Sequence, residues 1–136
     1  MNFDTVIYAD QITCTVPDSK IYFEKAGVYN IQFSAQLLNY YTQDDNVTVW
    51  FKKNGNPIEY SSSIQQVSSV HANGPGAIII ALNYVDEFAA GDYFELFWSS
   101  VTGYPVLATA APNTTSGAPA SPSLILTVQF VSAPTP

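Results

Sequence analysis

The chain has 136 residues, a net charge of −7, and four lysines with no arginine. That length suits a single domain, and an apolar content of 47% is enough for an independent core. Binding to nucleic acid or to an anionic membrane surface relies on Lys and Arg, so the composition excludes both as partners. We also expect no signal peptide and no membrane span, because no apolar run approaches the necessary length.

The first 19 residues contain two short extended segments that are rich in β-branched and aromatic residues. Residues 11–16 either form the first strand of the domain or belong to an N-terminal extended arm, and the single cysteine in them, Cys14, is expected to be a buried or half-buried apolar residue. Residues 1–8 are either part of the domain or an arm that leaves it and adds as a strand to a neighbouring protein. We favour the arm, with contacts from Phe3, Val6, Ile7 and Tyr8.

The next part of the chain predicts two strands and a hairpin turn. Residues 29–37 alternate strictly between apolar and polar, which is the pattern of a strand with one buried face. A second strand is predicted over residues 47–53, and Asn54-Gly55 after it is a strong hairpin turn signal. From Ile58 onward the chain is therefore expected to return as a partner strand.

The second half of the chain predicts further strands. Residues 77–85 are apolar on both faces, which is typical of a strand covered on both sides. Residues 93–100 alternate, and residues 104–108 predict a short strand. The last predicted strand, residues 123–131, again carries apolar side chains on both faces.

Residues 109–122 are rich in Ala, Pro, Ser and Thr, and this segment is too long for a plain hairpin. Residues 20–132 thus hold at least six strands separated by turns, and no convincing helix. This pattern predicts an all-β domain built as a two-sheet antiparallel sandwich or jelly roll, with residues 133–136 as a C-terminal tail.

Groups suited to catalysis or metal binding are scarce. The only histidine, His71, lies in a predicted loop, and no nucleophile motif accompanies it. The carboxylate pairs Asp44-Asp45 and Asp86-Glu87 lie beside predicted turns and are expected to be solvated. We therefore expect no enzyme, no cofactor and no metal site. Calcium binding at Asp44-Asp45 is the one alternative that remains open.

Four segments resemble structural proteins of tailed bacteriophages, especially cyanophages and other marine phages. They are residues 26–36, 47–55, 90–100 and 119–128. The resemblance implies a jelly roll similar to tumour necrosis factor that associates as trimers. It also implies a role as a capsid decoration (cement) protein or as a domain of a fibre. Residues 1–19 lie outside the resemblance.

Self-association also accounts for the doubly apolar strands. Residues 77–85 and 123–131 need cover on their outer side, either from loops of the same chain or from a second subunit. Aromatic residues, at 14% of the chain, are favoured in interface cores. We favour a subunit interface that includes Ile79 and Ile125.

Two functions of different classes follow from these observations. The first is a capsid decoration protein, made in the host cytoplasm, that binds as a homotrimer to the major capsid protein on the outer surface of the virion. The alternative is a receptor- or glycan-binding knob of a tail fibre or spike. In that case Tyr40, Tyr41 and Trp50 would stack on host-surface sugars. Alternation favours an outward Trp50 without settling it, and an outward Trp50 is either an interface anchor or a sugar platform.

Overall fold

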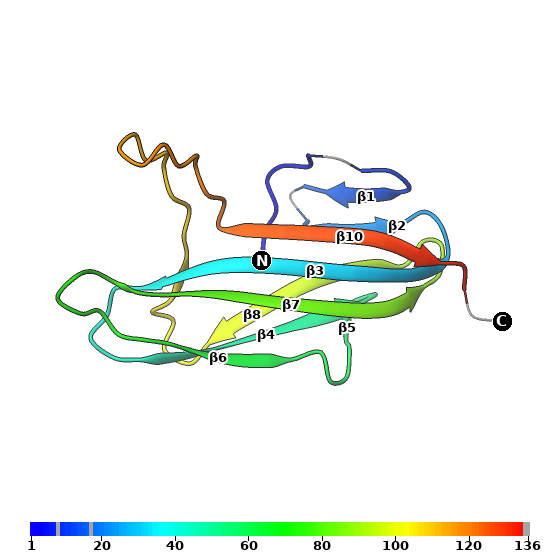
Figure 1. The fold of residues 1–136 in the computed structure, drawn as a ribbon. Helices are drawn as coiled ribbons and strands as arrows, with labels where there is room; N and C mark the ends of the chain where they lie inside the picture. Colours follow the sequence, from blue (N-terminus) through cyan, green and yellow to red (C-terminus); the bar gives the residue numbers. More distant parts are fainter. Residues whose placement is uncertain (8, 17, 135–136) are drawn as a thin grey trace.

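A computed structural model describes residues 1–7, 9–16 and 18–134. Within these residues the chain forms ten strands in two antiparallel sheets that face each other (Figure 1). None of the described residues belongs to a helix that could cross a bilayer. The expected all-β class with two antiparallel sheets is confirmed. The strands are β1 (Ile12–Thr15), β2 (Lys20–Phe23), β3 (Gly27–Asn39), β4 (Asp45–Lys53), β5 (Asn56–Pro57), β6 (Ser63–Val67), β7 (Gly76–Phe88), β8 (Tyr93–Ser100), β9 (Val106–Leu107) and β10 (Leu124–Ser132).

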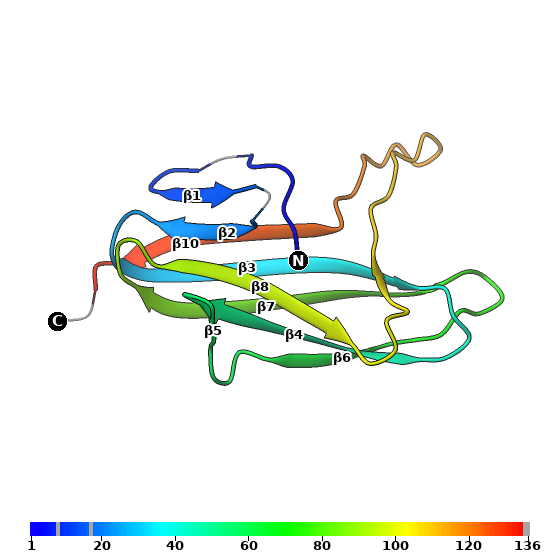
Figure 2. The same ribbon diagram turned by 180° about the vertical axis from the view of Figure 1, so that it is seen from behind.

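The two sheets have different strand orders. In sheet A the order is β1-β2-β8-β4-β5, and β6 also pairs with β4. In sheet B the order is β10-β3-β7, and β9 pairs with β3. Figure 2 shows β8 and β4 of sheet A from behind, lying across the long strands of sheet B. Strands that are neighbours in the sheets are therefore often far apart in the sequence, as in β2 with β8 and β3 with β10.

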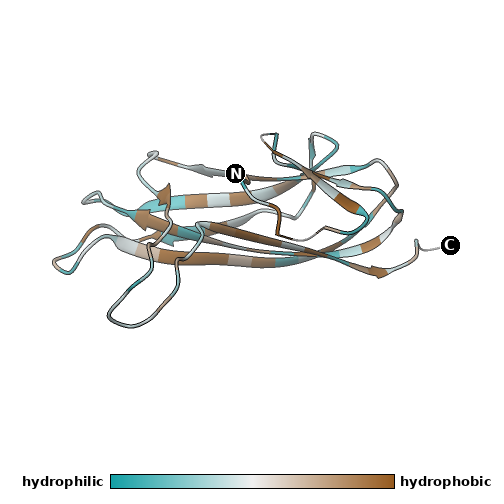
Figure 3. Cartoon of the chain, turned by 90° about the horizontal axis from the view of Figure 1, so that it is seen from above, coloured by the Kyte–Doolittle hydropathy of each residue, from teal (hydrophilic) through white to brown (hydrophobic). Residues whose placement is uncertain are grey.

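The core lies between the sheets and is made by the predicted alternation. In β3 every second residue is buried, including Tyr29, Ile31 and Leu37, as the sequence pattern predicts. Val49 and Phe51 of β4 are equally buried on the facing sheet. Each fully buried side chain of this kind contributes about 1.5–3 kcal/mol to folding. Figure 3 shows apolar residues recurring along the long strands.

The turn at Asn54-Gly55 forms as predicted, but the main partner strand after it begins later than predicted. Asn54 and Gly55 have φ angles of 51° and 80°, the left-handed conformation that an Asn-Gly hairpin uses. The returning strand β5 ends at Pro57, which has no N–H to donate to a ladder. The chain then turns outward at Tyr60, whose φ is 61°, and pairing with β4 resumes only in β6. The predicted partner strand of β4 therefore forms, but it begins at Ser63 and not at Ile58.

The prediction that residues 77–85 are covered on both sides is wrong within the chain. Ile80 on the inner side of β7 is 3% exposed, whereas Ile79 on the outer side is 65% exposed. No described segment lies over the outer side of sheet B, because the long loop stands away from it (Figure 1). That loop, residues 109–122, is an irregular hairpin joined by isolated bridges at Ala110–Ser121 and Asn113–Ala118.

The N-terminal residues lie against the domain. Residues 12–15 form β1, which pairs with β2 at the edge of sheet A. The Met1 ammonium donates to the Leu96 carbonyl oxygen at 2.8 Å, and Met1 and Phe3 both pack against the core. The first three residues thus fold back onto β8 and do not extend from the domain. The reason is that β2 pairs with β8 only at Tyr93 and Phe94, so the next part of β8 accepts a new neighbour.

Candidate interaction surfaces

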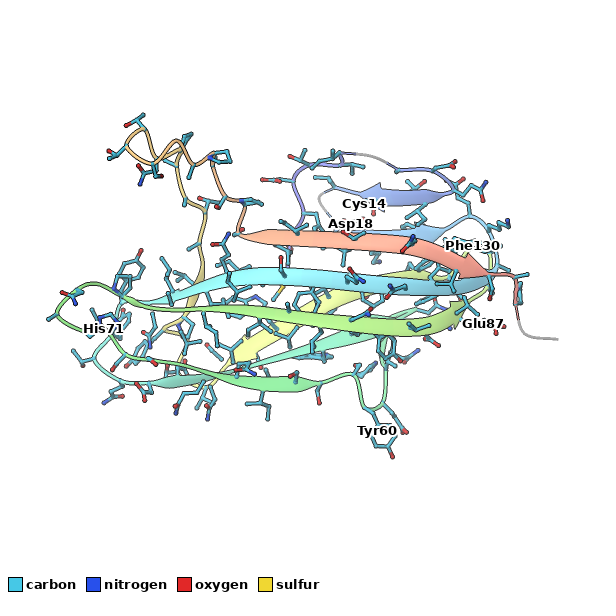
Figure 4. The ribbon with its side chains drawn as sticks, in the orientation of Figure 1. Cys14, Asp18, Tyr60, His71, Glu87 and Phe130 are labelled. Carbon is cyan, nitrogen blue, oxygen red and sulfur yellow. The ribbon has the colours of Figure 1, made fainter. Side chains whose placement is uncertain are left out.

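The outer side of sheet B is a flat, nearly uncharged surface. We call it face B and define it as every second residue of 28–38 in β3, 77–87 in β7 and 125–129 in β10. Among these described residues the only charged side chain is Glu87, which lies where β7 ends (Figure 4). The exposed apolar members include Ile79, Val85 and Ile125, at 65%, 55% and 51% exposure.

The structure brings the two predicted interface residues of sheet B onto this one face. Ile79 of β7 lies opposite Gln36 of β3, and Ile125 of β10 lies opposite Ser34 of β3. The two isoleucines therefore flank β3. The distance across two strand spacings is about 9–10 Å. Ile79 and Ile125, with Val85, which the sequence reasoning did not single out, therefore belong to a single surface.

Amide side chains fill the middle of face B. Asn30 pairs across the strands with Gln129, and Gln32 with Asn83. The Asn30 Oδ1 atom is buried and has no hydrogen-bond partner among the described residues. Buried acceptors in native proteins are almost always paired. The centre of face B therefore has hydrogen-bonding capacity without charge.

A hollow of about 630 Å³ lies between the N-terminal segment and β10. It is lined mostly by apolar side chains, among them Phe3, Val6, Ile7, Leu124 and Ile125. The outer edge of β10 has no partner strand among the described residues. Such an open edge is a template for strand addition.

The predicted arm residues have different environments. The Phe3 amide donates to Ser19 Oγ at 2.8 Å, and its ring packs against the core. Val6 is 46% exposed and Ile7 is 97% exposed, so these two remain accessible. Tyr8 lies outside the described residues. Of the predicted arm contacts that are described, Val6 and Ile7 are therefore the accessible ones.

The outer side of sheet A has the opposite character. We call it face A and define it as every second residue of 20–22 in β2, 46–52 in β4 and 93–99 in β8, together with Glu24 just after β2. Trp50 lies here, as alternation predicts, half-buried and stacked on Phe97 with ring centroids 5.7 Å apart. Phe97 was missed by the sequence reasoning, although the alternation that turns Leu96 inward also turns Phe97 outward.

All four lysines of the chain place their ammonium groups over aromatic rings. On face A, Lys52 Nζ lies 3.9 Å from the Phe97 centroid and Lys20 Nζ lies 4.6 Å from the Tyr93 centroid. Each cation–π contact of this kind is worth about 0.5–1 kcal/mol at an exposed site. The lysines therefore stabilise the aromatic rings of their own chain.

One member of each carboxylate pair, Asp45 or Asp86, is less solvated than predicted, whereas Asp44 and Glu87 are exposed. Asp45 is only 3% exposed, and it accepts hydrogen bonds from the Val101 and Thr102 amides and from the Thr102 hydroxyl. Desolvation opposes its charge, but these hydrogen bonds outweigh it and lower the pKa of Asp45 below its ordinary value. Asp44 accepts from the Ser69 amide at 2.7 Å. The prediction of a solvated carboxylate is therefore wrong for Asp45, whereas Asp44 is exposed as predicted.

Asp86 is also engaged. Its Oδ2 atom lies 3.8 Å from Lys53 Nζ, which lies equally far from Asp92. Desolvation again opposes the Asp92 charge, but hydrogen bonds from Asn54 and Ala89, together with Lys53, lower the pKa of this carboxyl. These groups brace the end of the sandwich at which β4 meets the β7–β8 turn.

The remaining reactive side chains are isolated. His71 is exposed in the turn that it closes with Gly74, and Figure 4 places it at the far end of the domain from Glu87. Cys14 is half-buried, and burial raises the pKa of its thiol. Among the described residues, no three His, Cys, Asp or Glu side chains are grouped as a metal site requires. The structure therefore directs attention to the two outer faces and the β10 edge.

Comparison with known proteins adds no relative. No protein-family model matches the chain, and no curated protein matches it.

Proposed function

We propose that the protein is a capsid decoration protein of a tailed bacteriophage, which binds as a homotrimer to the outer surface of the head. The four segments that resemble phage structural proteins include most of β3, β4, β8 and β10. These strands pair as β3 with β10 and as β4 with β8, one pair in each sheet. The resemblance therefore includes strands from the framework of both sheets.

The strand order also supports the jelly roll. An eight-stranded jelly roll interleaves two Greek keys. If β2 is counted as the second strand of such a jelly roll, then β2, β8, β4 and β6 of sheet A are its strands 2, 7, 4 and 5. In the same count, β10, β3 and β7 of sheet B are strands 8, 3 and 6 of the jelly roll. The first strand would lie beside β10, where the described residues include no strand but where residues 3–7 line the hollow.

The observation that carries the trimer is the lack of charge on face B. Copies with a net charge of −7 repel one another, so they associate best through a surface that adds no further like charge. The cores of subunit interfaces are depleted of charged residues and enriched in apolar ones. Face B meets this requirement with Ile79, Val85 and Ile125, and its amides supply hydrogen bonds across the interface.

The accessible part of the N-terminal segment provides the contact with the capsid. Val6 and Ile7 expose apolar side chains beside the unpaired edge of β10. Together they offer an apolar anchor and a backbone edge, which are the two elements of strand addition. Replacing Val6 and Ile7 by Asp leaves the buried contacts of Met1 and Phe3 in place. We expect this variant to stay trimeric and to bind heads more weakly.

The test measures mass in solution and copy number on the particle. Sedimentation equilibrium should give three chains per particle at micromolar concentration, and quantitative mass spectrometry of purified virions should give hundreds of copies. A monomer at every concentration, both free and when added to undecorated heads, would overturn the trimer. A handful of copies per virion would favour the alternative, a receptor-binding knob of a tail fibre.

A further inference from the structure

Face A carries two aromatic pairs on either side of one carboxylate. Trp50 and Phe97 are nearly parallel, with 27° between their planes. Tyr22 and Tyr93 form a second pair with centroids 5.5 Å apart. Phe97 and Tyr93 lie two residues to each side of Glu95 on β8, so about 13 Å of strand separates the two pairs.

These rings are held in place before any ligand arrives. Each ring is half-buried and packs against a ring on the adjacent strand. The Lys52 and Lys20 ammonium groups lie over Phe97 and Tyr93 and restrict them further. Rings fixed in this way lose little conformational freedom on binding, which favours affinity.

Polar groups lie between the rings, and Lys52 can bond a ligand there by moving its ammonium off the Phe97 ring, which it covers in the unliganded chain. Lys52 lies directly opposite Glu95 across β4 and β8, but the described residues show no ion pair between them. Thr48 and Ser99, also opposite each other, extend the row of donors and acceptors beyond Trp50. Face A thus alternates aromatic surface with hydroxyl, ammonium and carboxylate groups.

We infer that face A binds a linear, neutral oligosaccharide with equatorial linkages. Equatorial substituents leave flat C–H surfaces above and below each sugar ring, and such surfaces stack on aromatic rings. A ribbon-like chain can follow β8 from one aromatic pair to the other, and the separation of the two pairs requires an oligosaccharide longer than one sugar. Lys20 and Lys52 are balanced by Glu24 and Glu95, so the face selects no anion. This inference does not depend on the trimer, because it rests on the opposite sheet.

Calorimetric titration of the full chain with cellohexaose and with chitohexaose tests the inference. We expect at least one of them to bind. Trp50→Leu and Phe97→Leu should each weaken binding by about tenfold or more, as removal of a central aromatic anchor does. Tyr60→Leu is the matched control, because Tyr60 is 99% exposed on the β5–β6 turn, away from face A (Figure 4). It should leave the affinity unchanged.

Two further measurements keep the test decisive. If Trp50→Leu unfolds, Lys52→Met removes a polar contact without removing a ring, and it should weaken binding several-fold. Backbone amide shifts on titration should map to β4 and β8. Absence of binding by both hexasaccharides at millimolar concentration would overturn the inference. Amide shifts that map to other strands would also overturn it. So would a Trp50→Leu variant that is folded and binds normally. If only binding to heads is lost in that variant, face A is a protein contact and the inference is wrong.

Discussion

The two outer faces of the sandwich differ far more than the two inner ones. Both inner faces are mainly aliphatic and aromatic, because burying a polar group between the sheets costs free energy unless it is hydrogen-bonded, as Asp45 is. Outside, face A combines aromatic rings with lysines and carboxylates, whereas face B has amides and aliphatic residues and one charge near its edge. An inner face is dictated by folding, but an outer face is free to match what it meets. The contrast therefore indicates two different uses.

The strongest test of this contrast replaces one exposed isoleucine on the outer side of each sheet by lysine. Ile79 on face B and Ile64, which lies opposite Thr48 on the outer side of sheet A, are both 65% exposed. Ile79→Lys should abolish the trimer, because it places three buried charges in one interface. Ile64→Lys should leave it intact. Sedimentation velocity measures both. Equal behaviour of the two variants would break the comparison.

The next largest effect concerns the connection between the two sheets. Asp45 fixes residues 101–102, which lead from β8 in sheet A to β9 in sheet B. Asp45→Ala removes the acceptor of the Thr102 amide and hydroxyl, whereas the Val101 amide keeps its bond to the Asn46 carbonyl oxygen, and it should lower the free energy of unfolding by about 2–3 kcal/mol. Urea denaturation measures this loss. Asp44→Ala, which removes an exposed contact to Ser69, is the matched control and should cost less.

The same carboxylate predicts how stability depends on pH. The pKa of Asp45 is lower in the folded state, so its contribution is fully present above the unfolded pKa and is lost as the pH falls through the folded pKa. Asp92, with its pKa lowered in the same direction, adds to this loss. Thermal unfolding between pH 6 and pH 3 should show stability falling below about pH 4. In Asp45→Asn the fall should be shallower, and an unchanged slope would show that Asp45 is not responsible.

The smallest expected effect is a difference in stability between variants of two neighbouring lysines of β4, Lys52 and Lys53. Lys52 contacts only the Phe97 ring, whereas Lys53 also lies near Asp86 and Asp92. Lys52→Met should lower the free energy of unfolding by about 0.5–1 kcal/mol, the value of an exposed cation–π contact. Lys53→Met should cost more, since it also frees two carboxylates. Chemical denaturation distinguishes them, and a larger loss from Lys52→Met would contradict this account.

Alternation in the sequence was sufficient for the strands and for their inner faces. Residues 29–37 and 93–100 show a period of two with apolar residues on one side, and burial in a core requires that pattern. The Asn54-Gly55 turn was equally readable, because few other residues adopt its backbone angles. Even Phe97 was within reach, since it follows from the same alternation.

Only the tertiary structure decided which strands share a sheet. Ile79 and Ile125 lie far apart in the sequence, and they join one face because β7 and β10 both pair with β3. Trp50 joins the opposite face through the pairing of β4 with β8. Asp45 reads as a loop charge because its partner Thr102 lies 57 residues further along the chain. Local pattern fixes the orientation of each side chain, but long-range pairing, which no local pattern encodes, decides what it meets.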